Sequence, residues 1–400
     1  MDSPISDMMD SPTSAMASPS SSQFPPDCRS LDEFPVKEAQ KADIVRVASY
    51  HRKDFVLAVT RLDPAETDPH RTSLVAPFPQ APAANLGALE RLPLEILCEI
   101  TRLLDIASVF SLGQVSRRGR QAVAAVPEYK LVAQHALDAL RVVHRTGISK
   151  TFTVLEMYNT LRTRDCRLCG QFGGFVFLPE MSRCCYHCIC KAPELQAISA
   201  TRYHKYTGIT VAKARKLGIP MVHTLVGRYS FDVDGCMRRF RLLAKPRMFH
   251  DDPYWQGIEN SLMDQDTDND TYRYMAVTSL PFFDPETLEA QHGVCCTGCH
   301  LSFRKGQGLV DGSRSYALWV RVYSHEGFIR HFQWCAEAQA LWVSSQEGTV
   351  PIKVPIEESE HIRNGGWLKP WDPTQPTQKE MIRANRHPFP LSPPPPPPPH

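Results

Sequence analysis

Apolar side chains recur every three or four residues between residues 89 and 147, which is the spacing of amphipathic helices. Pro93 suits the first turn of the first predicted helix, because proline is tolerated where no intrahelical N–H bond is lost. The apolar side of that helix consists of Leu92, Ile96, Ile100 and Leu103.

Two more short helices are expected in the same segment. The second covers 109–115, with Asp105 or Ser108 as its cap and Gly113 at its end. The third is basic and stops at Pro127. Three short helices of roughly 40 residues form a small core, so we expect the module to pack on its own chain or on a partner.

The helical pattern continues beyond this module. A longer helix is predicted over 129–147, and Gly147 suits a left-handed cap at its end. Thr153 and Glu156 form a capping box at the start of the next helix. The apolar run 175–178 then predicts a short buried strand.

Further along the chain, strand and helix patterns are mixed. Residues 308–312 predict a turn, and 315–324 alternate like a strand, so a hairpin is expected there. Residues 326–342 have helical periodicity. These patterns predict the α+β class, with a three-helix module followed by a mixed domain.

Composition separates this folded middle from the two ends. Hydrophobic residues make up 42% of the chain, which is typical of a globular protein, while the 34 prolines are concentrated unevenly. Residues 1–87 are rich in Ser, Pro and Ala, and 346–400 end in a polyproline run, so both ends are expected to be disordered tails. An apolar island at 42–59 is either a helix or a strand.

Charge and targeting signals bear on the compartment. The formal net charge is +2, so no global field recruits nucleic acid or an acidic membrane. The first residues lack a secretory pattern, and no apolar run reaches the roughly 18 residues of a membrane helix. We therefore expect a cytoplasmic or nuclear protein with reduced thiols, where thirteen cysteines do not form a disulfide framework.

Four cysteines have the spacing of a zinc site. Cys166 and Cys169 form one C-x2-C pair, Cys185 and Cys188 form another, and 15 residues separate the pairs. Two thiolates two residues apart around a tight turn can bind one tetrahedral ion. Cys184 and Cys190 fall outside this spacing.

A second zinc site is expected downstream. Cys296 and Cys299 repeat the C-x2-C spacing, and His331 and Cys335 lie four residues apart on one face of the predicted helix. His300 and His325 are alternatives to His331. The 31 residues between Cys299 and His331 do not fit a DNA-reading zinc finger, which has about 12 at that position.

The helical module resembles an F-box. The resemblance consists of Leu-Pro-x-Glu-Ile at residues 92–96, the hydrophobic spacing through the second helix, and Val-Ser-Arg-Arg at 115–118. Gly119 stands where the common motif has a large residue. Together with the cysteine pattern, the stretch 88–340 is similar to a large group of filamentous-fungal F-box proteins.

This resemblance implies a non-catalytic substrate receptor of an SCF-type ubiquitin ligase. Its F-box would bind the Skp adaptor, and through it the cullin scaffold, by Leu92, Pro93, Ile96 and Ile100. The implied organisation is a leader over 1–87, an F-box over 88–130, a helical linker with a zinc-stabilised substrate-binding region over 131–345, and a tail over 346–400. The sequence has neither a phosphate loop nor a nucleophile elbow, the motifs that would indicate an enzyme.

The alternative is a zinc protein that binds nucleic acid. Residues 202–247 hold eleven Lys or Arg and two Asp, a local net charge of +9, with interleaved aromatic residues that could stack on bases. However, residues 251–290 carry a local net charge of −9. Neighbouring stretches of opposite charge favour mutual pairing or two solvated faces, so nucleic acid is the less favoured partner.

Overall fold

The structure, a computed structural model, describes residues 30, 32–62, 86–230, 238–245, 268–305 and 314–352. Helices and strands both occur, which confirms the α+β class. The chain forms two compact units: a split unit of residues up to Tyr50 and from Val294 to Val354, and a continuous unit that includes His51–Gly293. Among the described helices, none has the length and apolarity needed to cross a membrane.

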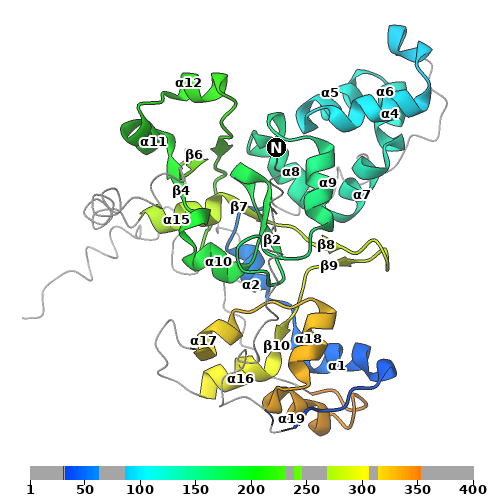
Figure 1. Ribbon diagram of the computed structural model, residues 1–400, viewed down its shortest axis with the longest axis vertical. Coiled ribbons are helices and arrows are strands. Elements are labelled where there is room, and N and C mark those ends of the chain that lie inside the picture. The colour runs from blue at the N-terminus through cyan, green and yellow to red at the C-terminus, as the bar shows by residue number, and fades with distance from the viewer. Residues whose placement is uncertain are drawn as a thin grey trace, which may run out of the picture. The chain divides into compact units, whose positions relative to one another are not determined.

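The continuous unit contains most of the helices, drawn in cyan to green in Figure 1. A 3-10 turn at Gly87–Arg91 leads into the series. The helices are α4 (Leu94–Leu103), α5 (Ile106–Val115), α6 (Arg117–Ala125), α7 (Pro127–His135), α8 (Leu137–Arg145) and α9 (Val154–Arg162).

Several of these helices begin or end at residues that the sequence predicted as caps. The carboxylate of Asp105 accepts the N–H of Ser108 at 3.0 Å and starts α5. Thr153 and Glu156 form the predicted capping box of α9, with each side chain accepting the other's backbone N–H. Gly147 has the expected left-handed conformation, with φ of 77°.

Two predicted helix boundaries were wrong. Helix α5 does not end at Gly113 but continues to Val115, because the turn is made by Ser116, whose hydroxyl caps α6. The long helix over 129–147 is two helices that meet at Ala136, where φ is −132° and ψ is 31°. This break lets α7 and α8 each bury an apolar side, so packing overrides the continuous helical pattern.

Short antiparallel sheets follow the helices. The predicted buried strand is β2 (Phe175–Phe177), which lies between β3 (Ser182–Cys184) and β7 (Val277–Ser279). A second sheet has the order β4 (Ala197–Ser199), β6 (Arg241–Ala244), β5 (Val222–His223), and β8 (Phe282–Phe283) pairs with β9 (Ala290–Gln291). The remaining helices of this unit are α2 (Lys53–Leu57), α10 (Tyr186–Lys191), α11 (Ala200–Thr207), α12 (Val211–Lys216) and α15 (Asp268–Met275).

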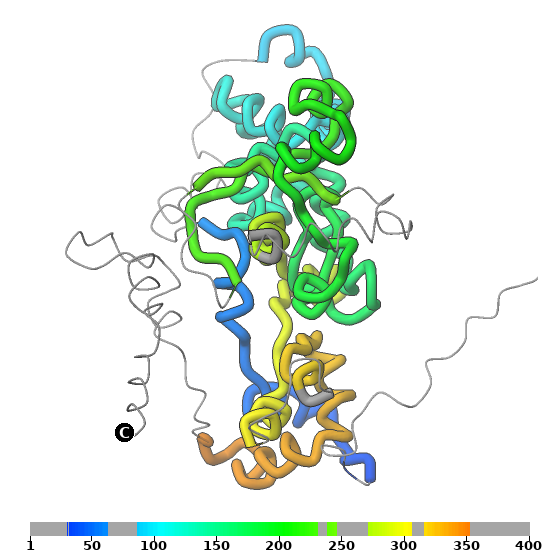
Figure 2. The backbone as a smooth tube through the Cα atoms, turned by 90° about the vertical axis from the view of Figure 1, so that its left-hand side faces the viewer, coloured from blue at the N-terminus to red at the C-terminus, as the bar shows by residue number. Residues whose placement is uncertain are grey.

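The split unit joins residues from both ends of the described chain. Strand β1 (Ser49–Tyr50) pairs with β10 (Cys295–Cys296), and α1 (Lys41–Ala48) packs against α18 (His325–Phe332) and α19 (Ala336–Ser344). Figures 1 and 2 both show blue α1 beside these orange helices. The helices from the later segment are α16 (Thr297–Lys305), α17 (Arg314–Trp319), α18 (His325–Phe332) and α19 (Ala336–Ser344).

Part of the expected leader is therefore folded. The apolar island at 42–59 forms α1, β1 and α2, with Ile44, Ala48 and Phe55 buried. Ile44 and Ala48 belong to the core of the split unit with Phe328, Phe332 and Trp342. Composition along 1–87 could not show this, because the packing partners lie far along the sequence. Residues 1–29, 63–85 and 353–400 lie outside the described residues.

The hairpin strand predicted over 315–324 was also wrong. Helix α17 occupies its first half, with Leu318 buried and the ring of Trp319 stacked on Phe303 of α16 at 4.5 Å. Packing against α16 decides the conformation of these aromatic and apolar residues, whose strand preference depends on context. Tyr323 alone pairs in extended fashion, with Val294. The predicted turn at 308–312 lies outside the described residues.

Candidate docking surface and metal centres

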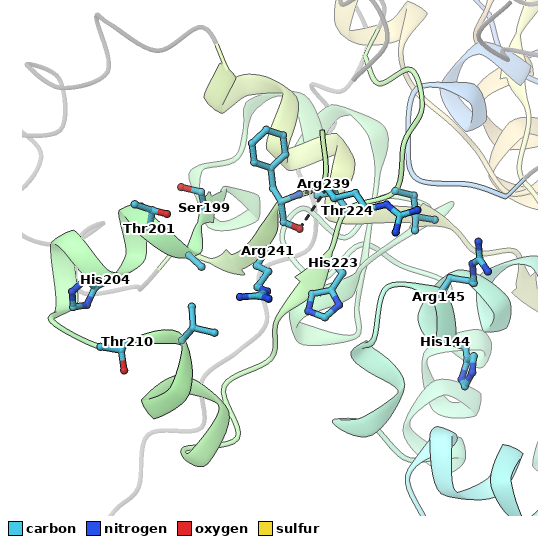
Figure 3. Close-up of a pocket in the computed structure, with 14 residues that line it drawn as sticks. His144, Arg145, Ser199, Thr201, His204, Thr210, His223, Thr224, Arg239 and Arg241 are labelled. Atoms are coloured by element: carbon cyan, nitrogen blue, oxygen red, sulfur yellow. Dashed lines mark hydrogen bonds between the residues drawn. The ribbon is translucent and has the colours of Figure 1, made fainter. Parts of the chain in front are cut away.

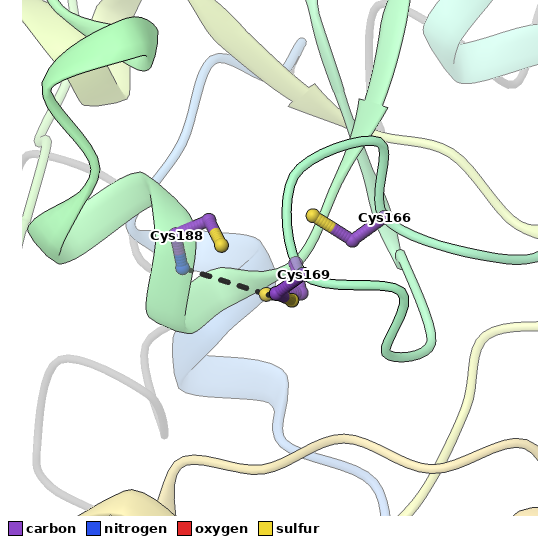
Figure 4. Close-up of side chains that lie close together, drawn as sticks. Cys166, Cys169 and Cys188 are labelled. Atoms are coloured by element: carbon purple, nitrogen blue, oxygen red, sulfur yellow. Dashed lines mark hydrogen bonds between the residues drawn. The ribbon is translucent and has the colours of Figure 1, made fainter. Parts of the chain in front are cut away.

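The first cysteine cluster joins a loop to a helix. Cys166 and Cys169 lie on the loop between α9 and β2, while Cys185 caps α10 and Cys188 lies within it. Gly170 has φ of +67°, and its N–H bonds to the Cys166 carbonyl at 2.9 Å, which closes the turn between the first two cysteines. Figure 4 shows the sulfurs of Cys166 and Cys188 turned toward each other.

A buried arginine holds this loop in place. Arg183 on β3 is 3% exposed, and its guanidinium donates to the carbonyls of Thr160, Leu161, Leu280 and Pro281. Its own carbonyl accepts the N–H of Arg167 at 3.0 Å, between the first two cysteines. Burial lowers the pKa of Arg183 to about 9. Gly173 leaves room for its stem, since a Cβ there would lie 2.6 Å from Cγ of Arg183.

The four sulfurs converge on one point. All lie within 4.8 Å of one another, and those of Cys169 and Cys185 are 3.5 Å apart. The neighbouring thiols lower the pKa of Cys166 and raise those of Cys185 and Cys188. The pKa of Cys169 is raised by Cys166 but lowered more by Cys185 and Cys188, to about 7. The cluster thus favours thiolates on the loop cysteines, and a cation could replace the protons of the other thiols. The cluster could hold a metal ion.

The two neighbouring cysteines lie outside this cluster. Cys184 is fully buried, and burial raises the pKa of its thiol well above the ordinary value. The hydroxyl of Tyr274 lies 3.4 Å from the sulfur of Cys190. The structure therefore brings together the four residues that the spacing predicted and leaves the other two apart.

The second cluster gathers residues from four elements of the split unit. Cys296 ends β10, Cys299 lies on α16, His331 on α18, and Cys335 immediately precedes α19. The sulfur of Cys335 lies 3.8 Å from that of Cys296 and 4.0 Å from that of Cys299. All four side chains are buried, and this group could also hold a metal ion.

His331 and Cys335 do lie together as predicted, but the reason given for it, a shared helix face, was wrong. His331 and Cys335 do not share a helix, because α18 ends at Phe332 and Cys335 has φ of −101° and ψ of 98°. The bend between the two helices, rather than a common helix face, brings them together. Gly298 permits the close approach of α16 and α19, since a Cβ there would lie 2.4 Å from the Ala338 nitrogen.

The three candidate histidines have different surroundings. Nε2 of His331 lies 3.3 Å from the sulfur of Cys299, and its Nδ1 lies 3.3 Å from the hydroxyl of Tyr323. Nδ1 of His300 instead accepts the indole N–H of Trp319 at 3.0 Å, and His325 begins α18 outside the cluster. Tyr323 was not foreseen, because a tyrosine eight residues before a histidine carries no sequence signal.

Helix α4 has both buried and exposed apolar side chains. Leu97 and Thr101 point inward and are buried, while Ile96, Ile100 and Leu103 are 47%, 39% and 74% exposed. Positions three and four apart form one stripe on a helix. Pro93 is exposed and Leu92 is half-buried at the start of this stripe. The exposed set, which we call the outer face, is Pro93, Ile96, Ile100 and Leu103.

Close packing holds the helices of this module together. A Cβ on Gly119 would lie 2.4 Å from the Leu112 carbonyl oxygen, so α5 and α6 approach too closely for any side chain there. The guanidinium of Arg102 on α4 forms an ion pair with the buried carboxylate of Glu128 on α7. This packing explains why a glycine occupies the position where a large residue was expected.

Residues 89–131 match the family model of the F-box domain. These helices form an F-box domain. Its bounds agree closely with the predicted 88–130, and it contains α4 to α6 and the start of α7. F-box domains are generally non-catalytic adaptors that bind the Skp adaptor within SCF complexes. Comparisons with curated proteins and with solved structures find no match for the chain.

The F-box match covers the helical module alone. It includes all four residues predicted to bind the adaptor, Leu92, Pro93, Ile96 and Ile100, and neither cysteine cluster. Similarity of the cysteine-rich region to fungal F-box proteins thus stays a prediction.

Proposed function

We propose that the protein is a substrate receptor of an SCF-type ubiquitin ligase, acting in the cytoplasm or nucleus. The Skp adaptor would bind Leu92, Pro93, Ile96 and Ile100, and would connect the chain to the cullin scaffold. The observation that carries this proposal is the outer face of α4 within an F-box domain. The receptor itself would catalyse nothing; it would raise the local concentration of a protein substrate near the charged ubiquitin-conjugating enzyme.

The energetics favour a partner on the outer face. Fully burying one isoleucine side chain stabilises a complex by about 1.5–3 kcal/mol. Ile96, Ile100 and Leu103 lie at relative positions 0, 4 and 7, so one apolar surface can cover all three. Contiguous exposed apolar residues of this kind are typical of interaction sites.

Co-purification with the Skp adaptor tests the proposal. The double variant Ile96→Asp, Ile100→Asp should lose the adaptor, because two carboxylates cannot be desolvated in an apolar interface. Leu288→Asp is the matched control, since Leu288 is 68% exposed and lies outside the F-box. Adaptor retention by the double variant at the level of the control would contradict the assignment.

We further propose that both clusters hold zinc in a structural role. A tetrahedral zinc with Zn–S bonds near 2.3 Å places its sulfurs about 3.8 Å apart. The observed sulfur separations of 3.5, 3.8 and 4.0 Å are close to that value. Four protein ligands leave no open position, which is the arrangement of a structural rather than a catalytic ion. The two sites would support the substrate-binding part of the receptor.

The structure gives less support to the nucleic-acid alternative. Two of the aromatic residues in 202–247, Tyr203 and Tyr229, are only 8% and 2% exposed. The hydroxyl of Tyr206 accepts from Arg202 at 2.8 Å. These rings are therefore poorly placed as stacking platforms for bases.

A further inference from the structure

A cavity of about 1100 Å³ opens in the continuous unit, where the sheet of β4, β6 and β5 meets α8, α11 and α12. Figure 3 shows its polar side chains. Three arginines and three histidines line it: Arg145, Arg239, Arg241, His144, His204 and His223. Within the described part of the chain, no carboxylate lines this cavity. We call it the cationic cavity.

Strand pairing forces two of these side chains together. His223 on β5 is the register partner of Arg241 on β6, and Figure 3 shows the two side chains next to each other. The pKa of His223 is lowered, first by burial and then by Arg241 and Arg215, so Arg241 carries the positive charge of this pair and the imidazole beside it is neutral near pH 7. The hydroxyl of Thr224 accepts the N–H of Phe240 at 2.7 Å, which fixes the chain between Arg239 and Arg241. The backbone that carries Arg239 and Arg241 is therefore fixed, and both positive charges lie at the cavity.

The end of α8 adds to this charge. His144 and Arg145 lie in its last turn, and the N–H of His223 donates to the Thr146 carbonyl at 2.8 Å. Gly147 leaves room for this contact, since a Cβ there would lie 3.3 Å from Nδ1 of His223. The end of α8 is thus joined to β5, and side chains from both elements line one cavity.

Burial and, secondarily, nearby cations keep the pKa values of two lining histidines low. Burial lowers the pKa of His223, and Arg241 and Arg215 lower it further. Burial likewise lowers the pKa of His144, with added effects of Arg145 and Lys150. On the opposite wall, the eight-residue helix α11 begins with Ala200 and Thr201, so its positive end also meets the cavity.

We propose that the cationic cavity binds a phosphate group on a phosphorylated segment of a protein substrate. The planar guanidinium groups of arginine match phosphate oxygens in paired hydrogen bonds. A doubly charged phosphate would also offset the charge of Arg241 and favour protonation of His223 beside it. That the phosphate is borne by a substrate rests on the receptor function proposed above; the anion site itself rests on the cavity alone.

Fluorescence anisotropy on the full chain tests the site. The probes are a peptide library with a central phosphoserine, the same library with serine, inorganic pyrophosphate as competitor, and single-stranded RNA. The phosphorylated library should bind at least about tenfold more tightly than the unmodified one. Arg239→Gln with Arg241→Gln should abolish that preference. The control is Lys213→Gln with Lys216→Gln, which removes the same charge from exposed positions outside the cavity. This control should keep the preference for the phosphorylated library.

A histidine signal gives an independent readout. Bound phosphate should raise the pKa of His223 measured by NMR, because the dianion counteracts Arg241. Equal binding of both libraries, or full binding by the arginine variant, would overturn the phosphate site. Tighter RNA binding through the same arginines would also overturn it. Phosphopeptide binding no tighter than that of pyrophosphate would overturn the protein-borne source. Adaptor co-purification by the arginine variant separates these failures from failure of the receptor function.

Discussion

The hydroxyl of Tyr323 and Nδ1 of His331 lie 3.3 Å apart, and the two rings stack with centroids 4.7 Å apart. The other ring nitrogen of His331 faces the sulfur of Cys299. With Nδ1 beside the hydroxyl, Nε2 is the nitrogen directed at the cluster. Burial raises the pKa of Tyr323 well above its usual range, so the hydroxyl stays neutral beside the thiols. Tyr323 thereby orients His331, the proposed metal ligand, without being a ligand itself.

Replacing Tyr323 by Phe should weaken metal binding at the second cluster by about 10- to 100-fold, as loss of an outer-shell partner typically does. The buried ring is kept, so the fold should survive. Competition with a chelator measures the change. Tyr316→Phe is the control, because Tyr316 lies on α17, where its ring lies near those of Phe303 and Trp319. An unchanged affinity in Tyr323→Phe would mean that packing alone orients His331.

Cys335→Ser should leave one bound metal of two, because a hydroxyl is a far poorer ligand than a thiolate for a soft site. Cys295→Ser is a close control: Cys295 is buried beside Cys296 but lies outside the cluster. Elemental analysis of the purified chains gives the count. Two metals in Cys335→Ser, or one in Cys295→Ser, would show that the ligand set is wrong.

The first cluster offers a test between adjacent residues. Cys185→Ser should lower metal content and make residues 164–192 sensitive to protease, since structural zinc contributes on the order of 10 kcal/mol to a small domain. Cys184→Ser should keep the metal, because the Cys184 sulfur lies outside the cluster. Limited proteolysis with and without chelator measures both. Equal metal loss in the two variants would contradict the choice between these cysteines.

Two glycines of the F-box should respond in opposite directions to alanine. Gly119→Ala should lower the free energy of unfolding by about 1–3 kcal/mol, because its Cβ would overlap the Leu112 carbonyl oxygen. Gly113→Ala should raise it by about 0.5–1 kcal/mol, since Gly113 lies inside α5 with only Val123 nearby, at 3.9 Å. Denaturant unfolding of the two variants decides this. A stabilised Gly119→Ala would mean that α5 and α6 can separate without cost.

Local sequence signals predicted the parts of this fold that depend on neighbouring residues. Thr153 and Gly147 act through groups within four residues, and their roles were predicted correctly. The cap of α5 was predicted as Asp105 or Ser108, and the structure has Asp105. The cysteine pairs were predicted for the same reason, since each pair closes within one turn. At Ala136 and in helix α17, packing determined the backbone conformation, and the periodic pattern alone predicted the wrong element.

Features made by distant residues could not be predicted. The cationic cavity needs α8, β5 and β6 together, and the charge count over 202–247 could not separate the arginines of a cavity from those of a solvated face. Cys335 reached the second cluster by a bend that no periodicity indicates. The pairing of β1 with β10 likewise leaves no trace in the composition of the first 87 residues.

That pairing has a consequence for synthesis of the chain on the ribosome. Glu33 accepts a hydrogen bond from Gln333, which is made 300 residues later. At about 5–20 residues per second, the N-terminal segment waits roughly 15–60 seconds for its partners, with Ile44 and Ala48 uncovered. The continuous unit, F-box included, emerges during that interval and can fold first. The second cluster therefore closes last, and if it holds the proposed metal, we expect its metal content to distinguish finished chains from those released early.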